Sequence, residues 1–250
     1  MLTVEQIITQ LNADDSLFTR EALEQAILHQ EAITPALLTI IENVAIDPLS
    51  IEDTPAFTYA LYLLAQFREK RAYPFIVQYF GALGLESEAL DPTGDIVTEN
   101  LKNILASVCH GDLSLIKQLI EDPLVNEYVR SAALDSLVIL YNIDQLSRES
   151  LVGYIGNLFD PDEDPFFIAS LVSIACTIHP EELYDVSVNC FDQELVDEFI
   201  VDRECLDDYM QMDIGKVLVE LKESRQYQLI NDAISDMQWW SYFSPEASPN

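Results

Sequence analysis

Apolar side chains at helical spacing dominate this 250-residue sequence. Residues 126–141 carry them at intervals of three and four, which places one stripe on a single helix face: Val129, Ala133, Leu137 and Leu140. A similar stripe spans residues from about 206 to 221, with Leu206, Met210, Val217 and Leu221. The strict alternation that marks strands is hard to find anywhere. The sequence therefore predicts an all-α fold.

Prolines indicate where the helices begin. Three pairs combine a residue suited to the N-cap with proline at the first helical position: Thr34–Pro35, Thr54–Pro55 and Asp164–Pro165. Four further pairs are typical of turns or helix boundaries: Asp47–Pro48, Asp91–Pro92, Asp122–Pro123 and Asp160–Pro161. Their spacing predicts helices of 10 to 17 residues joined by short connectors, as in stacked helical hairpins.

An internal repeat supports that arrangement. Ala60, Ala133 and Ala169 occupy equivalent small positions in three segments, and they lie 73 and 36 residues apart. A spacing near 36 residues is typical of solenoids built from helix pairs. We predict a single α-solenoid of stacked antiparallel helix pairs over residues 1–243, with capping helices near 3–12 and 229–243. Residues 244–250 are expected to form a mobile tail.

The segment around residue 130 carries a family resemblance. Val129, Arg130, Ala133 and Leu137 resemble the VR-x-x-A-x-x-x-L signature of a HEAT second helix, so the fold is expected to be HEAT- or armadillo-like. The whole chain also resembles an uncharacterised bacterial family, domain-of-unknown-function family 1186, in its acidity, capped helices and aromatic end. That resemblance implies neither an activity nor a cofactor.

The charge balance excludes several kinds of ligand. The chain has 44 acidic and 12 basic residues, a net charge of −32, yet 49% of it is hydrophobic. That much apolar material argues against disorder. So few basic side chains argue against direct nucleic-acid binding and against anionic membranes. The sequence shows no secretory signal and no run of about 18 apolar residues, so we expect a cytoplasmic protein. Because the net charge is strongly negative, we expect its partner to have a basic surface.

Acidic residues concentrate in the C-terminal third. Residues 160–213 hold sixteen of them against one basic residue, Arg203. The densest part comprises Asp192, Glu194, Asp197, Glu198, Asp202, Glu204, Asp207 and Asp208. One interpretation is an anionic face that receives a basic protein; the other is a set of solvated outer helix faces. We predict a non-enzymatic protein-binding scaffold or adaptor that uses this region.

An enzymatic alternative stays open at this point, namely a HEAT-like lyase or a metal-dependent hydrolase with clustered carboxylates and His179. The chain contains three histidines, and its four cysteines form no C-x-x-C pair. Residues 160–171 lack the glycine and the glutamate of an EF-hand loop. We therefore predict no catalytic residue, metal or cofactor.

Two aromatic clusters have alternative interpretations. Residues 57–80 contain eight of the 24 aromatic side chains, which we expect to fill the core, with Arg68, Lys70 and Arg71 in a turn between two helices. Trp239 and Trp240 either cap the last hydrophobic face of the solenoid or anchor a partner. They are included among the candidate partner-binding residues.

Overall fold

The structure, a computed structural model, describes residues 2–13, 18–85, 87–93 and 95–238. These residues contain no strand, which confirms the all-α prediction. The α-helices are α1 (Val4–Leu11), α2 (Arg20–Leu28), α3 (Gln30–Ile46), α4 (Ala56–Gln66), α5 (Tyr73–Gly81), α6 (Ile96–Glu99), α7 (Leu101–Val108), α8 (Ser114–Glu121), α9 (Glu127–Asn142), α10 (Arg148–Gly156), α11 (Pro165–Thr177), α12 (Tyr184–Asp192), α13 (Arg203–Gln211), α14 (Ile214–Glu223) and α15 (Ala233–Met237). Short 3-10 helices are η1 (Pro48–Asp53), η2 (Lys70–Ala72), η3 (Ser87–Thr93) and η4 (Arg225–Tyr227).

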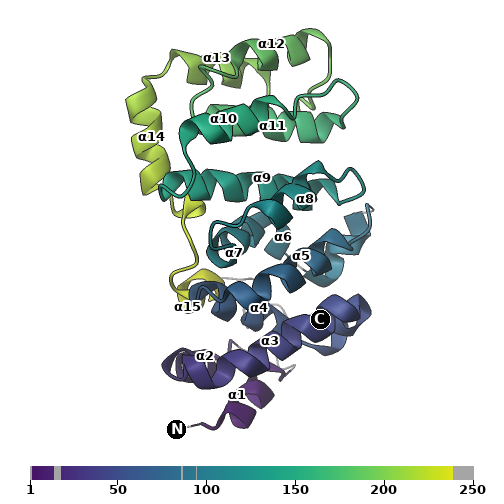
Figure 1. The fold of residues 1–250 in the computed structure, drawn as a ribbon, viewed down its shortest axis with the longest axis vertical. Coiled ribbons are helices and arrows are strands. Elements are labelled where there is room, and N and C mark those ends of the chain that lie inside the picture. Colours follow the sequence, from purple (N-terminus) through teal and green to yellow (C-terminus); the bar gives the residue numbers. More distant parts are fainter. Residues whose placement is uncertain (1, 14–17, 86, 94, 239–250) are drawn as a thin grey trace, which may run out of the picture.

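The helices up to α13 follow one another along the longest axis of the molecule (Figure 1). One row of neighbours runs in chain order, because α4 packs between α3 and α7, α9 between α7 and α11, and α11 between α9 and α13. The other helices lie beside this row: α5 contacts α8, α8 contacts α9, and α12 contacts α13. The more specific HEAT-like identification and the single-domain boundary at residue 243 stay predictions.

The helix-start signals were right at one proline and wrong at another. Asp164 is the N-cap of α11, where its side chain accepts a hydrogen bond from the backbone N–H of Phe166 at 2.8 Å, and Pro165 opens the helix. Pro35, by contrast, lies inside α3, which begins at Gln30. Thr34 caps nothing there, because its hydroxyl donates to the carbonyl of Gln30 at 2.7 Å. The stripe over residues 206–221 belongs to two helices, α13 and α14, since Asp213 caps a new helix start.

Side chains from every layer form one continuous apolar core. The aromatic segment lies in it as expected, with Phe57, Tyr62, Tyr79 and Phe80 among the most deeply buried side chains. Arg68 and η2 lie in the turn between α4 and α5, which confirms that prediction. No helix in the described ranges is both long and apolar enough to span a bilayer.

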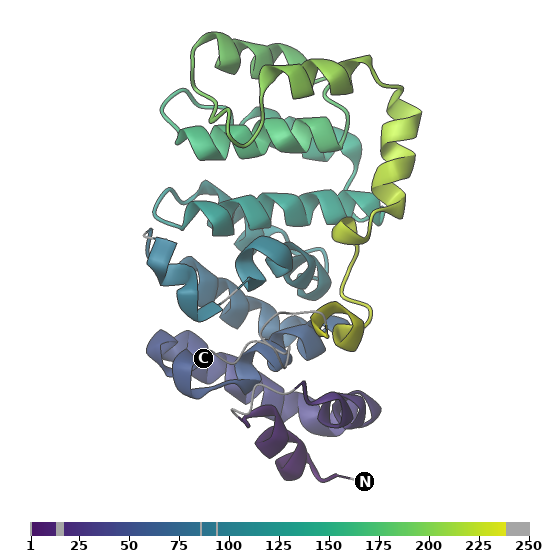
Figure 2. The same cartoon turned by 180° about the vertical axis from the view of Figure 1, so that it is seen from behind.

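The end of the described chain does not cap the last layer. After α13, the chain enters α14, which runs across the edges of the layers, and continues through η4 to α15 beside the N-terminal half (Figures 1 and 2). There α15 packs against α2 and α4. The predicted capping helix near 229–243 is therefore wrong in its place: residues 233–237 cover early helices, while α12 and α13 form the far end.

Candidate partner-binding surface

The densest acidic stretch, here called the acidic segment (residues 192–208), links the last two helices of the stack. Glu194 follows α12 with a φ of 58°, a left-handed conformation that ends the helix. The buried side chains of Val196 and Val201 hold the connecting loop to the body. The backbone N–H of Asp197 donates to the carbonyl of Pro165 at 3.2 Å. The loop is thus fixed against the beginning of α11.

The eight predicted acidic residues divide by exposure. Six are exposed: Asp192, Glu194, Glu198, Asp202, Glu204 and Asp208. Asp197 and Asp207 are half-buried. The one basic residue of the segment, Arg203, faces Asp192 at 3.6 Å and Asp207 at 3.0 Å. The structure thus brings the predicted residues together at one end of the molecule and leaves most of their charge in solvent.

Three of these carboxylates also hold local structure. Asp202 is the N-cap of α13 and accepts from the backbone N–H of Cys205 at 2.8 Å. Asp197 accepts from the backbone N–H of Phe199 at 3.0 Å. The hydrogen bonds from Tyr184 and Arg203 lower the pKa of Asp207 below its ordinary value. The exposed carboxylates that take no part in these local contacts are those of Glu194, Glu198, Glu204 and Asp208.

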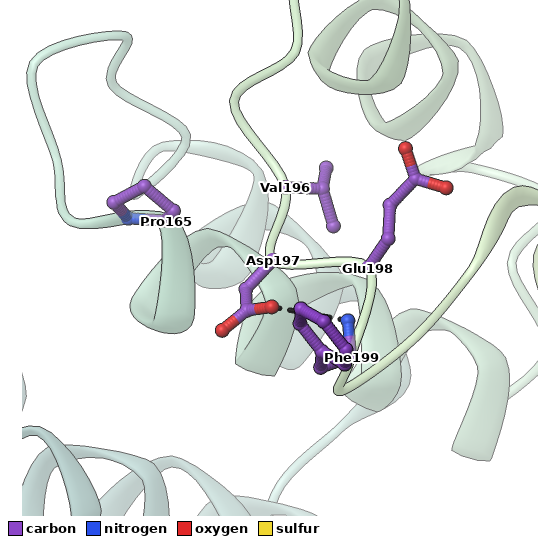
Figure 3. Close-up of a pocket in the computed structure, with 5 residues that line it drawn as sticks. All are labelled: Pro165, Val196, Asp197, Glu198 and Phe199. Atoms are coloured by element: carbon purple, nitrogen blue, oxygen red, sulfur yellow. Dashed lines mark hydrogen bonds between the residues drawn. The ribbon is translucent and has the colours of Figure 1, made fainter.

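An exposed phenylalanine stands among these charges. Phe199 is fully exposed and Ile200 is about half exposed, with a relative exposure of 48%. Asp197, Glu198 and Phe199 line an open surface hollow of about 440 Å³ together with Pro165 and Val196 (Figure 3). In that view Glu198 projects away from the loop, and the dashed line marks the hydrogen bond from the backbone N–H of Phe199 to the Asp197 carboxylate. The site combines an apolar projection with anionic surroundings.

Acidic side chains from other layers extend this surface. Burial raises the pKa of Glu127, at the start of α9, and the nearby carboxylates of Asp164 and Asp197 raise it further. Glu127 and Asp164 both occupy helix N-termini, where the helix dipole favours negative charge. The acidic surface therefore follows the edge at which α9 and α11 begin.

The described residues bring together no group of three or more His, Cys, Asp or Glu side chains suited to a metal ion. His179 is buried, and its Nε2 lies 3.2 Å from the carbonyl oxygen of Met212, so it sits in packing away from the hollow beside Phe199. The cysteines are all free, and burial raises the pKa of Cys176 to about 12. The enzymatic alternative stays a prediction.

Trp239 and Trp240, which were also predicted to bind a partner, lie outside the described residues, so that prediction is untested. Phe199 and Ile200 were missed, although a usable signal exists: they are an apolar pair between carboxylates in a stretch without helical periodicity. Helical periodicity does not reveal such a pair, because its two residues do not recur at a regular spacing.

A family model and two relatives match almost the whole chain. A family model described as a protein of unknown function (DUF1186) matches residues 2–244. A protein of Chlamydia trachomatis serovar D, described as uncharacterized, is 39% identical over 247 residues and is covered to 96%, as is this chain. A protein of Chlamydia muridarum with the same description is 38% identical, with 96% of this chain and 97% of the relative covered. No solved structure matches. This chain belongs to the DUF1186 family.

Proposed function

We propose that this chain is a non-enzymatic scaffold or adaptor that binds a basic protein through the acidic segment. The observation that carries the proposal is the fully exposed Phe199, which lines an open surface hollow together with Asp197 and Glu198. Phe199 and Ile200 form an adjacent pair of exposed apolar side chains, and phenylalanine is among the residues that are enriched in protein–protein interfaces relative to the rest of the surface. A phenylalanine surrounded by carboxylates suits a partner that presents an apolar patch within lysines or arginines.

The charge distribution supports an electrostatic first encounter. Residues 192–208 contain eight acidic and one basic residue, and most of these carboxylates are exposed. Such a surface accelerates association with a cationic partner and weakens with salt, because exposed charges are screened beyond a Debye length of about 10 Å at 0.1 M. The apolar contact at Phe199 would supply the part of the affinity that survives salt.

The proposal is tested with a fluorescent peptide of alternating lysine and leucine, whose binding to the full chain is followed by anisotropy. We expect binding that weakens at least about tenfold as salt rises from about 0.05 M to about 0.5 M. The triple variant Glu194→Gln, Glu198→Gln and Glu204→Gln should lose most of the salt-dependent affinity. The variant Phe199→Ser should weaken binding by a similar factor at every salt concentration.

Two matched controls separate this surface from the net charge. Glu21, Glu31 and Glu42 are exposed on α2 and α3, so replacing them with Gln removes the same three charges elsewhere. Leu49 is 86% exposed, so Leu49→Ser removes an unrelated exposed apolar group. If the control variants weaken peptide binding as much as the acidic-segment variants, the proposed surface is wrong.

A further inference from the structure

Residues 224–238, here called the return segment, lie along one edge of the helix stack (Figure 2). The segment leaves α14, passes α9 at η4 and ends in α15 against α4 and α2. Between η4 and α15 the backbone is extended, with φ −123° and ψ 160° at Gln228. A late part of the chain therefore crosses successive early helices as a bound peptide would.

The stack holds this segment by its main chain. Asn103 on α7 donates both amide hydrogens to the carbonyls of Gln226 and Gln228, at 2.9 and 2.7 Å. Asn142, at the end of α9, donates to the carbonyl of Tyr227 at 2.9 Å. Contacts to backbone groups do not depend on which side chains the bound segment carries.

The same pattern continues toward the N-terminal half. Ser107 on α7 accepts from the backbone N–H of Ile230 at 3.0 Å. The side chain of Gln66, at the end of α4, accepts from the backbone N–H of Ala233 at 2.8 Å. Arg68 donates to the carbonyl of Ile230 at 2.6 Å. We call Gln66, Arg68, Asn103, Ser107 and Asn142 the main-chain clamp.

Several side chains of the return segment also hold it in place: Asn231 accepts a hydrogen bond from Arg68 at 2.7 Å, and Gln238 accepts one from Arg20 at 2.6 Å. Ile230, Ala233, Ile234 and Met237 are buried, whereas the neighbouring Gln226, Asn231 and Asp232 are exposed. Anchors separated by exposed polar residues are typical of a peptide ligand in a groove.

One side chain of the return segment, Tyr227, is bound through its hydroxyl group. Tyr227 donates to Asp135 at 3.2 Å, and Lys102 pairs with the same carboxylate at 3.3 Å. The ammonium group of Lys102 also lies 4.8 Å from the centre of the Tyr227 ring. Asp135 and Lys102 thus hold the Tyr227 side chain by its hydroxyl group and by its ring.

The clamp is not fully satisfied by this occupant. Both amide hydrogens of Asn142 have acceptors, but its buried Oδ1 has no hydrogen-bond partner within the described part of the chain. A buried acceptor that has no donor lowers the stability of the folded chain. A bound segment with a backbone N–H at this position would supply the missing donor and would therefore fit the clamp better than the return segment does.

We infer that this edge of the stack is a peptide-binding groove, which the return segment occupies in cis. When that segment leaves, the groove takes an extended segment of a partner protein. The partner segment carries tyrosine at the position of Tyr227 and aliphatic residues at those of Ile230 and Ile234. Because a tethered occupant acts at an effective concentration near the millimolar range, the intact chain binds such a segment weakly.

The test uses the full chain and a fluorescent peptide with the sequence of residues 224–238. In the variant Ile230→Ala with Met237→Ala, the tethered segment loses its deepest anchors while the clamp is unchanged. We expect this variant to bind the peptide at least about tenfold more tightly than the unmodified chain does. Adding Asn103→Ala and Asn142→Ala should cancel the gain, and a peptide with Phe in place of Tyr should bind several-fold more weakly.

Three results would overturn the inference. These are equal affinity of the unmodified chain and the double variant for the peptide, equal binding of a scrambled peptide, and a dimer formed by exchange of return segments that the peptide fails to dissociate.

Hydrogen exchange on the unmodified chain is a second test that needs no variant. The amides of Ile230 and Ala233 should exchange at least about tenfold faster than those in the middle of α9. Exchange as slow as in α9 would mean that the segment never opens separately.

Discussion

At the scale of single residues, Arg130 shows what the HEAT-like signature does in this chain. Arg130 is buried, and its Nε donates to the carbonyl of Ile120 at 2.9 Å. The guanidinium makes two hydrogen bonds with the Glu163 carboxylate, at 3.0 and 2.9 Å, and lies 3.6 Å from the centre of the Phe167 ring. One side chain thus joins the end of α8, the start of α9 and the beginning of α11.

Replacing this arginine should cost far more stability than replacing an exposed cation. Arg130→Ala leaves the half-buried Glu163 without its partner and the carbonyl of Ile120 without a donor. We therefore expect the free energy of unfolding to fall by about 3–5 kcal/mol, as measured by urea denaturation. Lys216→Ala is the control, because Lys216 forms an exposed pair with Glu220 at 3.9 Å and should cost less than about 1 kcal/mol. Similar losses in the two variants would contradict this role of Arg130.

The sequence identified Arg130 as part of a motif but not its partners. The motif covers nine consecutive residues of one helix, whereas Glu163 lies 33 residues away in another layer. Burial of the aromatic residues in 57–80 was easier to predict, because helical spacing alone puts their rings on an inward face. Residue type and period indicate which side chains are buried; they do not indicate which buried groups meet.

At the scale of helices, local capping signals were reliable only where no earlier residue had started the helix. Asp164 begins α11 after a loop, and Pro165 occupies its first turn. Thr34 and Pro35 have the same sequence pattern, but they lie within α3, which begins at Gln30. Pro35 removes one backbone donor from the second turn of α3. The start of α3 is set instead by α2, because only His29 separates the two helices. The pairing of an N-cap residue with proline says nothing about whether a helix has already begun upstream.

The capping role of Asp164 can be measured against its neighbour. Asp164→Ala removes the acceptor for the backbone N–H of Phe166, so the chain should lose about 1 kcal/mol of stability. Asp162→Ala removes an equal charge two residues away, at an exposed position, and should be nearly neutral. Urea denaturation of both variants tests this. If both variants lose the same amount, charge rather than capping explains the effect.

At the scale of the whole molecule, stacking brings together acids that are far apart in the sequence. Glu127, Asp164 and Asp197 come from α9, the start of α11 and the acidic segment. Because burial and these neighbours raise the pKa of Glu127, the ionised form of Glu127 destabilises the folded state relative to the unfolded state. That penalty is complete above the raised pKa and vanishes below the ordinary glutamate value of about 4.3.

Glu127→Gln should therefore raise the melting temperature near neutral pH and leave it unchanged below about pH 4. Glu149 is a matched control, because it is an exposed glutamate in the first turn of α10. Glu149→Gln likewise removes one charge from the first turn of a helix, but it relieves no such crowding, so it should give no gain. Thermal unfolding followed by circular dichroism at both pH values measures the difference. A gain of equal size at acidic pH would show that the cause is not ionisation.

Long-range arrangement was the least predictable part of the structure. The repeat of small residues indicated stacked helices, and the described helices do lie in layers. The return segment escaped prediction because its contacts join residues 226 and 228 to residue 103, more than 120 positions earlier. The amide side chains that make these contacts have no distinctive spacing.

The return segment also ties the first helices to the end of protein synthesis. Gln66 and Arg68 leave the ribosome early, yet the backbone groups they bind, at Ala233 and Ile230, are among the last to be made. A stack of helices can assemble progressively from its N-terminus as it is translated. Here α2 and α4 acquire their final cover only when residues 230–237 emerge, so a chain that stops at α13 leaves its earliest layers incomplete.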